Sequence, residues 1–316
     1  MVRGVEAVPG AIRVNGLSRS FGGITAVDSL DFEVAHGELF GLVGPDGAGK
    51  TTTLRMLAGV LRPTSGDAEI AGISIVRQPE RVKHQLAYMP QRFRLYGDLT
   101  VVENLHFYAD LYRVPKAERD QRLERLFAFS NLGPFRDRLA ADLSGGMKQK
   151  LGLSCALVHR PDVLLLDEPT FGVDPVSRRD LWLIVHEMVA EGVTAVVSTA
   201  YMDEAERFDR VALLHRGRLL ALDTPQELQQ TIRGELLEVR IEQVRQARAV
   251  VRSLPAVRRA AVFGDRLHLT VSSVARETPV VQAALHAAGL TALGMQPIAP
   301  SLEDVFIDRV AAAEEA

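Results

Sequence analysis

Apolar and polar residues alternate along the first part of the chain in the manner of strands. The alternation runs through residues 11–18 and 26–34, and the mostly apolar run 39–43 then leads into a glycine-rich loop. Alternation with a period of two predicts strands. Residues 51–60 and 99–132 instead place apolar side chains three and four positions apart, which predicts helices.

Two short apolar runs, 163–166 and 194–198, predict strands of another kind. A strand without polar alternation is typical of a parallel sheet that is covered on both faces. We therefore expect an α/β domain over residues 11–232, mostly parallel in its sheet, with a helical subdomain at about 92–160.

The last eighty-odd residues form a different pattern, which predicts a second, smaller α+β domain at 235–316. Its order of strand, helix, hairpin, helix and strand suggests a ferredoxin-like unit, followed by one more helix that begins with a Ser-x-x-Asp cap. The hairpin is expected to turn at Gly264 and Asp265. In chain order the predicted segments are 237–241, 244–254, 256–263 with 266–271, 279–290, 291–298 and 301–310.

Composition narrows the class of protein. With 316 residues, 47% hydrophobic and 24% charged, the chain is an ordinary globular protein with a substantial core. A net charge of −3 gives no reason to expect a nucleic-acid partner. The single cysteine, Cys155, excludes an intrachain disulfide and fits a reducing cytoplasm. We see no signal peptide and no apolar run near the ~20 residues of a membrane-spanning helix, so a membrane role would need a partner.

The glycine-rich loop carries the strongest chemical signal. Residues 44–51 fit the pattern G-x-x-x-x-G-K-[ST] between a predicted strand and a predicted helix. Glycines let backbone N–H groups curl around phosphates, and the start of the helix adds its positive end. Lys50 is expected to reach the β- and γ-phosphates of ATP, and the Thr51 hydroxyl to ligate Mg²⁺. The predicted ATP-binding residues of this segment are Gly44, Pro45, Asp46, Gly47, Ala48, Gly49, Lys50, Thr51 and Thr52.

Two carboxylates follow the apolar strand 163–166. In an open α/β sheet, ligands lie at the carboxyl ends of the strands, which is where Asp167 and Glu168 are expected. Asp167 would hold Mg²⁺, and Glu168 would act as the general base toward the attacking water. An apolar run followed by Asp-Glu is by itself more often a plain strand end, and the phosphate loop is what favours the functional interpretation.

Residues 143–147, LSGGM, place a serine and two glycines at the start of a predicted helix, which alone is a weak phosphate-binding signal. Together with the phosphate loop and LLLDEP, the segment resembles the signature sequence of ATP-binding cassette (ABC) ATPases. The resemblance covers about residues 11–230. It implies that two cassettes sandwich two ATP molecules, so that Ser144, Gly145 and Gly146 would contact the nucleotide of a partner subunit, in a homodimer or a heterodimer.

Other positions match this family one at a time. Phe21 stands at the place of the aromatic residue that stacks on adenine, although a core Phe is the plainer interpretation. Gln91 matches the glutamine that touches Mg²⁺ and couples the site to a membrane partner, which makes Thr51, Gln91 and Asp167 the implied metal ligands. Residues 172–175 resemble the loop that crosses the dimer interface.

Two further segments are similar to cassettes that serve type-2 ABC exporters: 94–104, and 300–306 near the C-terminus. The resemblance implies a separate ABC-2-type membrane permease as partner, with this chain held on the cytoplasmic face of the cell membrane. The role of the C-terminal domain and the transported substrate are not implied.

The chain departs from the family's pattern at two positions. Ala200 stands where most such cassettes carry a histidine that senses the γ-phosphate, and Asp46 replaces the usual Asn. Loss of such a positioned group commonly lowers a rate ~10²–10⁴-fold. The leading hypothesis is therefore an exporter ATPase with slow turnover driven by Glu168. The alternatives are a regulatory cassette that binds ATP with little hydrolysis, and a soluble ABC ATPase without a membrane partner.

Overall fold

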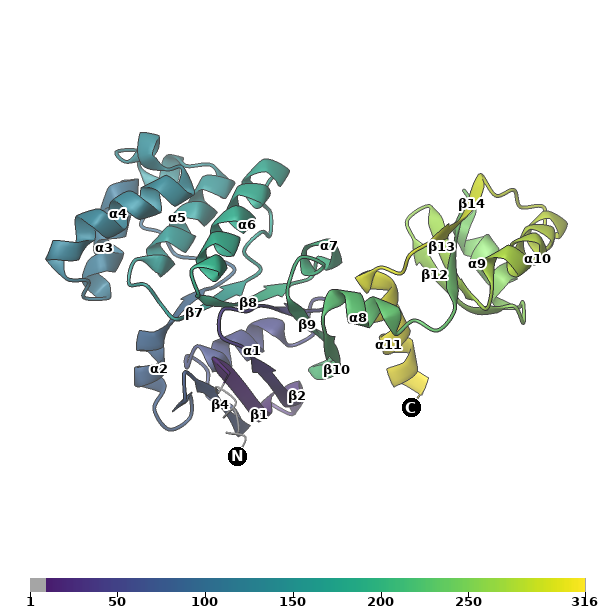
Figure 1. Ribbon diagram of the computed structural model, residues 1–316, viewed down its shortest axis with the longest axis horizontal. Coiled ribbons are helices and arrows are strands. Elements are labelled where there is room, and N and C mark those ends of the chain that lie inside the picture. The colour runs from purple at the N-terminus through teal and green to yellow at the C-terminus, as the bar shows by residue number, and fades with distance from the viewer. Residues whose placement is uncertain (1–9, 316) are drawn as a thin grey trace, which may run out of the picture. The chain divides into compact units, whose positions relative to one another are not determined.

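The computed structural model describes residues 10–315, and it divides into two compact units between Leu219 and Leu220. Figure 1 shows the elements of both units along the chain. The two units are described separately, and strand β10 (Arg218–Asp223), which spans the boundary, is described with the sheet to which it pairs.

A six-stranded sheet forms the centre of the first unit, in the order β10-β9-β3-β8-β7-β6. The pairs β3–β8, β3–β9, β6–β7 and β7–β8 are parallel, which confirms the predicted parallel sheet. Every residue of β3, β7 and β8 is buried, as expected for strands covered on both faces. The strands are β3 (Leu39–Val43), β6 (Leu86–Met89), β7 (Val163–Asp167), β8 (Thr194–Thr199), β9 (Arg210–His215) and β10 (Arg218–Asp223).

A second, four-stranded sheet has the order β2-β1-β4-β5, with antiparallel neighbours. The predicted strands in residues 11–34 become β1 (Ile12–Phe21) and β2 (Ile24–Val34). The shorter β4 (Ser65–Ile70) and β5 (Ile73–Ser74) complete it. Helix α1 (Lys50–Leu57) contacts β2 of this sheet and also β7 and β8, so it lies between the two sheets (Figure 1).

The remaining helices of the first unit cover the central sheet, and α3 to α6 gather on one side of it (Figure 1). Asn104 is fully buried at the start of this group, and its side-chain amide donates to three backbone oxygens, those of Tyr96, Leu99 and Thr100. The buried Asn104 side chain therefore holds the turn within the exporter-like segment 94–104. The helices are α2 (Pro79–Gln85), α3 (Val101–Leu111), α4 (Lys116–Ser130), α5 (Gly145–Leu157), α6 (Pro175–Ala190) and α7 (Met202–Ala205).

The second unit contains a four-stranded antiparallel sheet in the order β12-β13-β11-β14. Helices α9 and α10 pack on it around a core of aliphatic side chains that includes Leu237, Val251 and Leu269. The hairpin turns at Gly264 and Asp265 as predicted. The elements are α8 (Pro225–Gln230), β11 (Glu235–Arg240), α9 (Val244–Arg252), β12 (Val257–Phe263), β13 (Arg266–Val271), α10 (Val274–Ala287), β14 (Gly294–Ile298) and α11 (Leu302–Glu315).

Helix α11 starts with the predicted Ser-x-x-Asp cap. The Asp304 carboxylate accepts hydrogen bonds from the Ser301 N–H and hydroxyl at 3.0 and 2.7 Å, and the Asp304 N–H donates to the Ser301 hydroxyl. The same carboxylate lies 2.7 Å from His268 Nδ1 of β13. Segment 300–306 therefore caps a helix and ties it to the sheet. Over the described residues, no helix is both long and apolar enough to span a bilayer.

Candidate functional site

The phosphate-loop segment lies between β3 and α1, at the carboxyl end of the central sheet. Gly49 has φ +100°, and a Cβ there would lie 2.6 Å from a backbone oxygen, so the loop requires glycine. A Cβ on Gly44 would lie 2.2 Å from the Leu214 oxygen. The remaining loop residues differ in exposure: Ala48 is buried, and Asp46 faces solvent. The backbone is thus shaped for a ligand that approaches closely.

Lys50 is buried at the first position of α1, with 4% of its surface exposed. Its ammonium group donates to the Gly44 and Pro45 carbonyl oxygens at 2.7 and 3.1 Å. It also lies 3.1 Å from Glu168 Oε1. The loop lysine and the proposed base are therefore neighbours.

Asp167 ends β7 and is 1% exposed. Its Oδ1 accepts hydrogen bonds from the Thr51 and Ser198 hydroxyls at 2.8 and 2.7 Å, and its Oδ2 accepts one from Tyr88 at 3.3 Å. Burial and then the Asp167 charge raise the pKa of Tyr88 to about 12, so this phenol stays a donor. Within residues 10–315, no cationic side chain pairs with this carboxylate.

Burial of a charged carboxylate is costly when its hydrogen bonds come only from neutral hydroxyls, and a bound cation would offset that cost. Oxygen donors are also the ligands that Mg²⁺ prefers, and Mg²⁺ keeps several waters while binding one or two carboxylates. Asp167 and the Thr51 hydroxyl are 2.8 Å apart and therefore fit such an ion. Gln91, the third implied ligand, is exposed and points its amide nitrogen at Glu168 rather than at this pair.

Glu168 has a left-handed backbone, with φ +47°, which is uncommon for a residue other than glycine. Its N–H donates to the Ser198 hydroxyl and carbonyl oxygens at 3.0 and 3.1 Å, which holds this conformation. Its carboxylate accepts from Gln91 Nε2 at 3.0 Å. Strained backbone of this kind tends to occur at functional sites.

These residues enclose one hollow of about 230 Å³. Its lining includes the loop residues from Asp46 to Thr52 together with Ala26, Gln91 and Glu168. The structure therefore brings together the phosphate loop, the lysine and the two carboxylates that the sequence singled out.

The predicted signature residues Ser144, Gly145 and Gly146 and the predicted adenine-stacking residue Phe21 lie outside the lining of this hollow. Ser144 and Gly145 are exposed at the start of α5, where the Ser144 hydroxyl accepts from the Met147 N–H at 3.3 Å. Gly146 is buried, and a Cβ there would lie 2.1 Å from the Ser177 hydroxyl. Phe21, at the end of β1, is 44% exposed and carries the Arg19 guanidinium 4.4 Å from its ring centre.

Ala200 is exposed immediately after β8. The preceding residue is fixed on both sides: the Thr199 carbonyl accepts from the Gly44 N–H at 3.2 Å, and its hydroxyl donates to the buried Glu204 at 3.0 Å. Position 200 thus follows directly on a contact with the phosphate loop, and it offers no side-chain donor there.

Sequence reasoning missed Tyr88 and Ser198, which hold Asp167. Their roles depend on strand register: Ser198 pairs with Asp167 across β7 and β8, and Tyr88 pairs with Leu165 across β6 and β7. The position of Tyr88 three residues before Gln91, at the end of an apolar run, was the available signal.

A parallel sheet with a glycine-rich loop between β3 and α1, and with two carboxylates at the end of β7, which is separated from β3 by β8 alone, defines a P-loop nucleotide-binding protein. Residues 27–171 match the family model described as ABC transporter. The chain is 38% identical to the daunorubicin/doxorubicin resistance ATP-binding protein DrrA of Streptomyces peucetius, over 78% of this chain and 75% of that protein. The chain therefore belongs to the ABC transporter family, among its ATP-binding proteins.

Two further relatives agree with this assignment. The chain is 45% identical to the probable multidrug ABC transporter ATP-binding protein YbhF of Escherichia coli over 96% of its own length, but it spans only about half of that protein, 52%. A solved structure of an ATP-binding subunit of an ABC transporter superposes with a TM-score of 0.64 at 32% identity, covering 70% of this chain and 92% of that one.

Proposed function

We propose that this chain binds Mg-ATP and hydrolyses it as the cassette subunit of an ABC exporter, driving a separate ABC-2-type permease from the cytoplasmic face of the membrane. The observation that carries the proposal is the single hollow lined by Lys50, Thr51 and Glu168, with buried Asp167 bonded to Thr51. The relatives' names, which refer to drug resistance and multidrug transport, support the export part.

In this proposal each residue has one task. Lys50 and the loop N–H groups hold the phosphates, and Asp167 with Thr51, joined by Gln91, would hold Mg²⁺, which neutralises phosphate charge when bound. Glu168 takes a proton from the water that attacks the γ-phosphate, giving ADP and phosphate. The Lys50–Glu168 pair separates when phosphates reach Lys50, which frees the carboxylate for that water.

The site also needs a second cassette. Ser144 and Gly145 are exposed and lie outside the hollow, so they are available to face the nucleotide of a partner. We infer a head-to-tail dimer in which residues 144–146 of one cassette complete the site of the other. Phe21, exposed at the end of β1, would stack on adenine once Arg19 moves aside.

The test combines Mg-ATP binding with single-turnover hydrolysis, using Glu168→Gln as the matched control because it keeps size and removes the base. We expect both proteins to bind ATP and to dimerise in light scattering, and only the parent chain to release phosphate. Absence of ATP binding would refute the proposal as a whole.

One observation favours a second candidate, a regulatory cassette that switches on ATP binding with little hydrolysis: the missing donor at Ala200. ATP-dependent dimerisation of the parent chain, with phosphate release no faster than in Glu168→Gln, would favour this candidate over the exporter ATPase. Co-purification with a membrane permease would then decide whether the switch acts on transport.

A further inference from the structure

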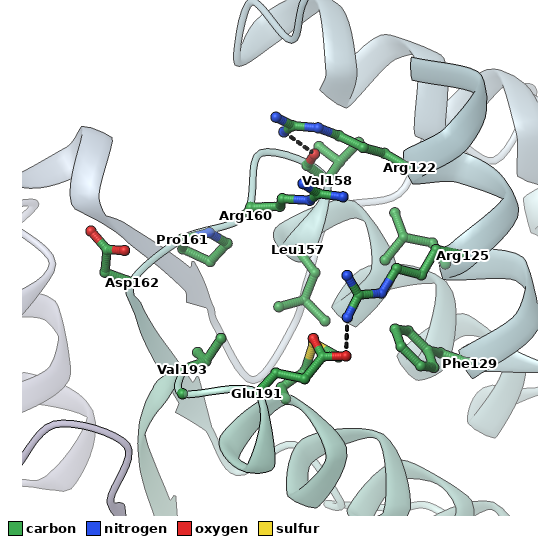
Figure 2. Close-up of a pocket in the computed structure, with 13 residues that line it drawn as sticks. Arg122, Arg125, Phe129, Leu157, Val158, Arg160, Pro161, Asp162, Glu191 and Val193 are labelled. Carbon is green, nitrogen blue, oxygen red and sulfur yellow. Dashed lines mark hydrogen bonds and ion pairs between the residues drawn. The ribbon is translucent and has the colours of Figure 1, made fainter. Parts of the chain in front are cut away.

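A second hollow, of about 260 Å³, lies at the amino ends of strands β7 and β8 of the central sheet (Figure 2). Asp162 and Val193 line it and immediately precede β7 and β8, whereas Glu168 and Ala200 immediately follow these strands. The walls come from α4, from the end of α5 with the chain that leads to β7, and from the end of α6 with the chain that leads to β8. This hollow is therefore separate from the nucleotide site.

The lining combines an apolar interior with a basic rim. Figure 2 shows Leu157 at the centre of the view, with the Arg125 side chain reaching toward it from α4 and the Arg160 side chain passing above it toward Val158. A third arginine, Arg122, completes the rim, and Asp162 and Glu191 are the acidic residues of the lining. The apolar residues are Leu126, Phe129, Leu157, Val158, Pro161, Met188 and Val193.

Arg122 and Arg125 already have partners within the protein. Arg122 donates to the Val158 carbonyl oxygen at 3.1 Å and to Glu118 at 2.5 Å, so it secures the end of α5. Arg125 forms an ion pair with Glu191, which shows that the rim accepts a carboxylate against its guanidinium (Figure 2). The carboxylate of a ligand would lie beside the Arg125–Glu191 ion pair.

Arg160 is different. It is exposed, and its side chain has no hydrogen bond or ion pair among residues 10–315. Its φ is +56°, the left-handed conformation in which helices commonly end and in which glycine is usual. Glycine would adopt this backbone conformation with less strain than arginine, so Arg160 can be exchanged for glycine without cost to the fold.

We propose that this hollow binds a small carboxylate with an apolar tail, such as a medium-chain fatty acid. The tail fills the space over Leu157 and Val193, and the carboxylate accepts a forked pair of hydrogen bonds from Arg160. The planar guanidinium of Arg160 can donate both of these hydrogen bonds at once.

The ligand would contact the ends of two helices that matter elsewhere. Helix α5 follows its cap residue Ser144 and reaches the hollow at Leu157, and α6 follows its cap residue Asp174 and reaches the hollow at Met188. If the proposed function holds, the opposite ends of these helices meet the partner cassette. Binding of a ligand in the hollow is therefore expected to change the affinity of the cassette for ATP.

Octanoate is the probe for the binding experiment, measured by calorimetry and by the fluorescence of Trp182, the only tryptophan of the chain, which is buried in α6. We expect a dissociation constant of about 0.1–1 mM, as is reasonable for about ten heavy atoms. Arg160→Gly relieves the left-handed strain and should fold normally, yet weaken octanoate about tenfold. Acetate and octanol, each with half of the recognised chemistry, should bind far more weakly.

Arg113→Gly is the matched control, because Arg113 is also exposed and left-handed, at φ +55°, but does not line the hollow. Equal octanoate affinity of the Arg160 and Arg113 variants, or octanol binding as tight as octanoate, would overturn the site. The effector part is tested by ATP affinity with and without saturating octanoate. An unchanged affinity refutes the effector part alone, whereas failure to bind ATP without octanoate refutes the proposed function.

Discussion

Restoring a histidine at position 200 is the sharpest test of the nucleotide site. Ala200 is exposed, so the imidazole of Ala200→His has room and should not overpack the core. Its backbone is held in place, because Thr199 bonds both Gly44 and Glu204 and the Tyr201 N–H donates to the Thr199 hydroxyl at 3.0 Å. The new side chain would begin one residue from a contact with the phosphate loop.

The expected gain follows from the value of one added donor. A preorganised donor to charge that develops in the transition state is worth about 10²–10³ in rate where the site has evolved around it. Ala200 is exposed, and water weakens a donor at such a position, so we expect a rise of about tenfold to a hundredfold in single-turnover hydrolysis. The affinity for ATP should change much less, because the loop and Lys50 supply most of the ground-state contacts.

The assay is phosphate release under single turnover, with nucleotide affinity measured in parallel. The double variant Ala200→His, Glu168→Gln serves as control and should stay inert, since the donor acts only when the base is present. A parent chain that already turns over as fast as Ala200→His would contradict the reasoning, because the missing donor would then limit nothing.

Three further predictions follow from single contacts. Gly49→Ala should abolish ATP binding and destabilise the first unit by about 1–3 kcal/mol, since its φ of +100° disfavours a side chain, as equilibrium binding and thermal unfolding would show. Tyr88→Phe removes the hydrogen bond from the phenol to Asp167 Oδ2 and should raise the Mg²⁺ concentration needed for nucleotide binding several-fold. Burial favours the neutral acid of Asp304, but hydrogen bonds from His268 and Ser301 outweigh it and lower the pKa of this group. The ionised Asp304 therefore stabilises the fold at pH values above its unfolded pKa of about 3.9. This stabilisation is lost as the pH falls through the lower pKa of the folded state. In Asp304→Asn the hydrogen-exchange protection of β13 should therefore decrease less steeply with falling pH.

The first two of these variants have a matched control in the same chain, and the third is compared with the parent chain. Tyr108→Phe also removes a phenol, one that donates to the Arg94 carbonyl oxygen, and should leave the Mg²⁺ requirement unchanged. Gly47→Ala also places a side chain at positive φ, +77°, but meets open space, and should cost less stability than Gly49→Ala. If Asp304→Asn and the parent chain lose protection in parallel between pH 5 and 3, the contact with His268 carries no pH dependence.

Local signals sufficed for the parts of the site that lie within one strand-loop-helix segment. The spacing of Gly44, Gly49 and Lys50 fixes the loop, and the apolar run before Asp167 fixes its strand, so both could be placed without knowing any partner. The parallel sheet followed from the same buried runs.

Features that depend on distant chain segments could not be predicted. Tyr88 and Ser198 reach Asp167 only through strand register. Helix α10 begins at Val274, five residues before the predicted start at Pro279, because the Val274 N–H donates to the Glu235 carboxylate at 2.6 Å, 39 residues away in the chain. A proline near the start of a helical pattern predicts that the helix begins there. The additional first turn, before Pro279, is seen only in the contact with Glu235 of β11.

The backbone of Glu168 also bears on how such a protein can change over time. Glycine at this position would relax the φ of +47°, and we expect such a variant to be more stable than the parent chain while unable to activate water. Stabilising substitutions are easily found in most proteins, but here the simplest one removes the base. A stabilising glycine at residue 168 would therefore keep nucleotide binding and abolish hydrolysis. One substitution would convert an ATP-hydrolysing cassette into one that responds to ATP binding alone.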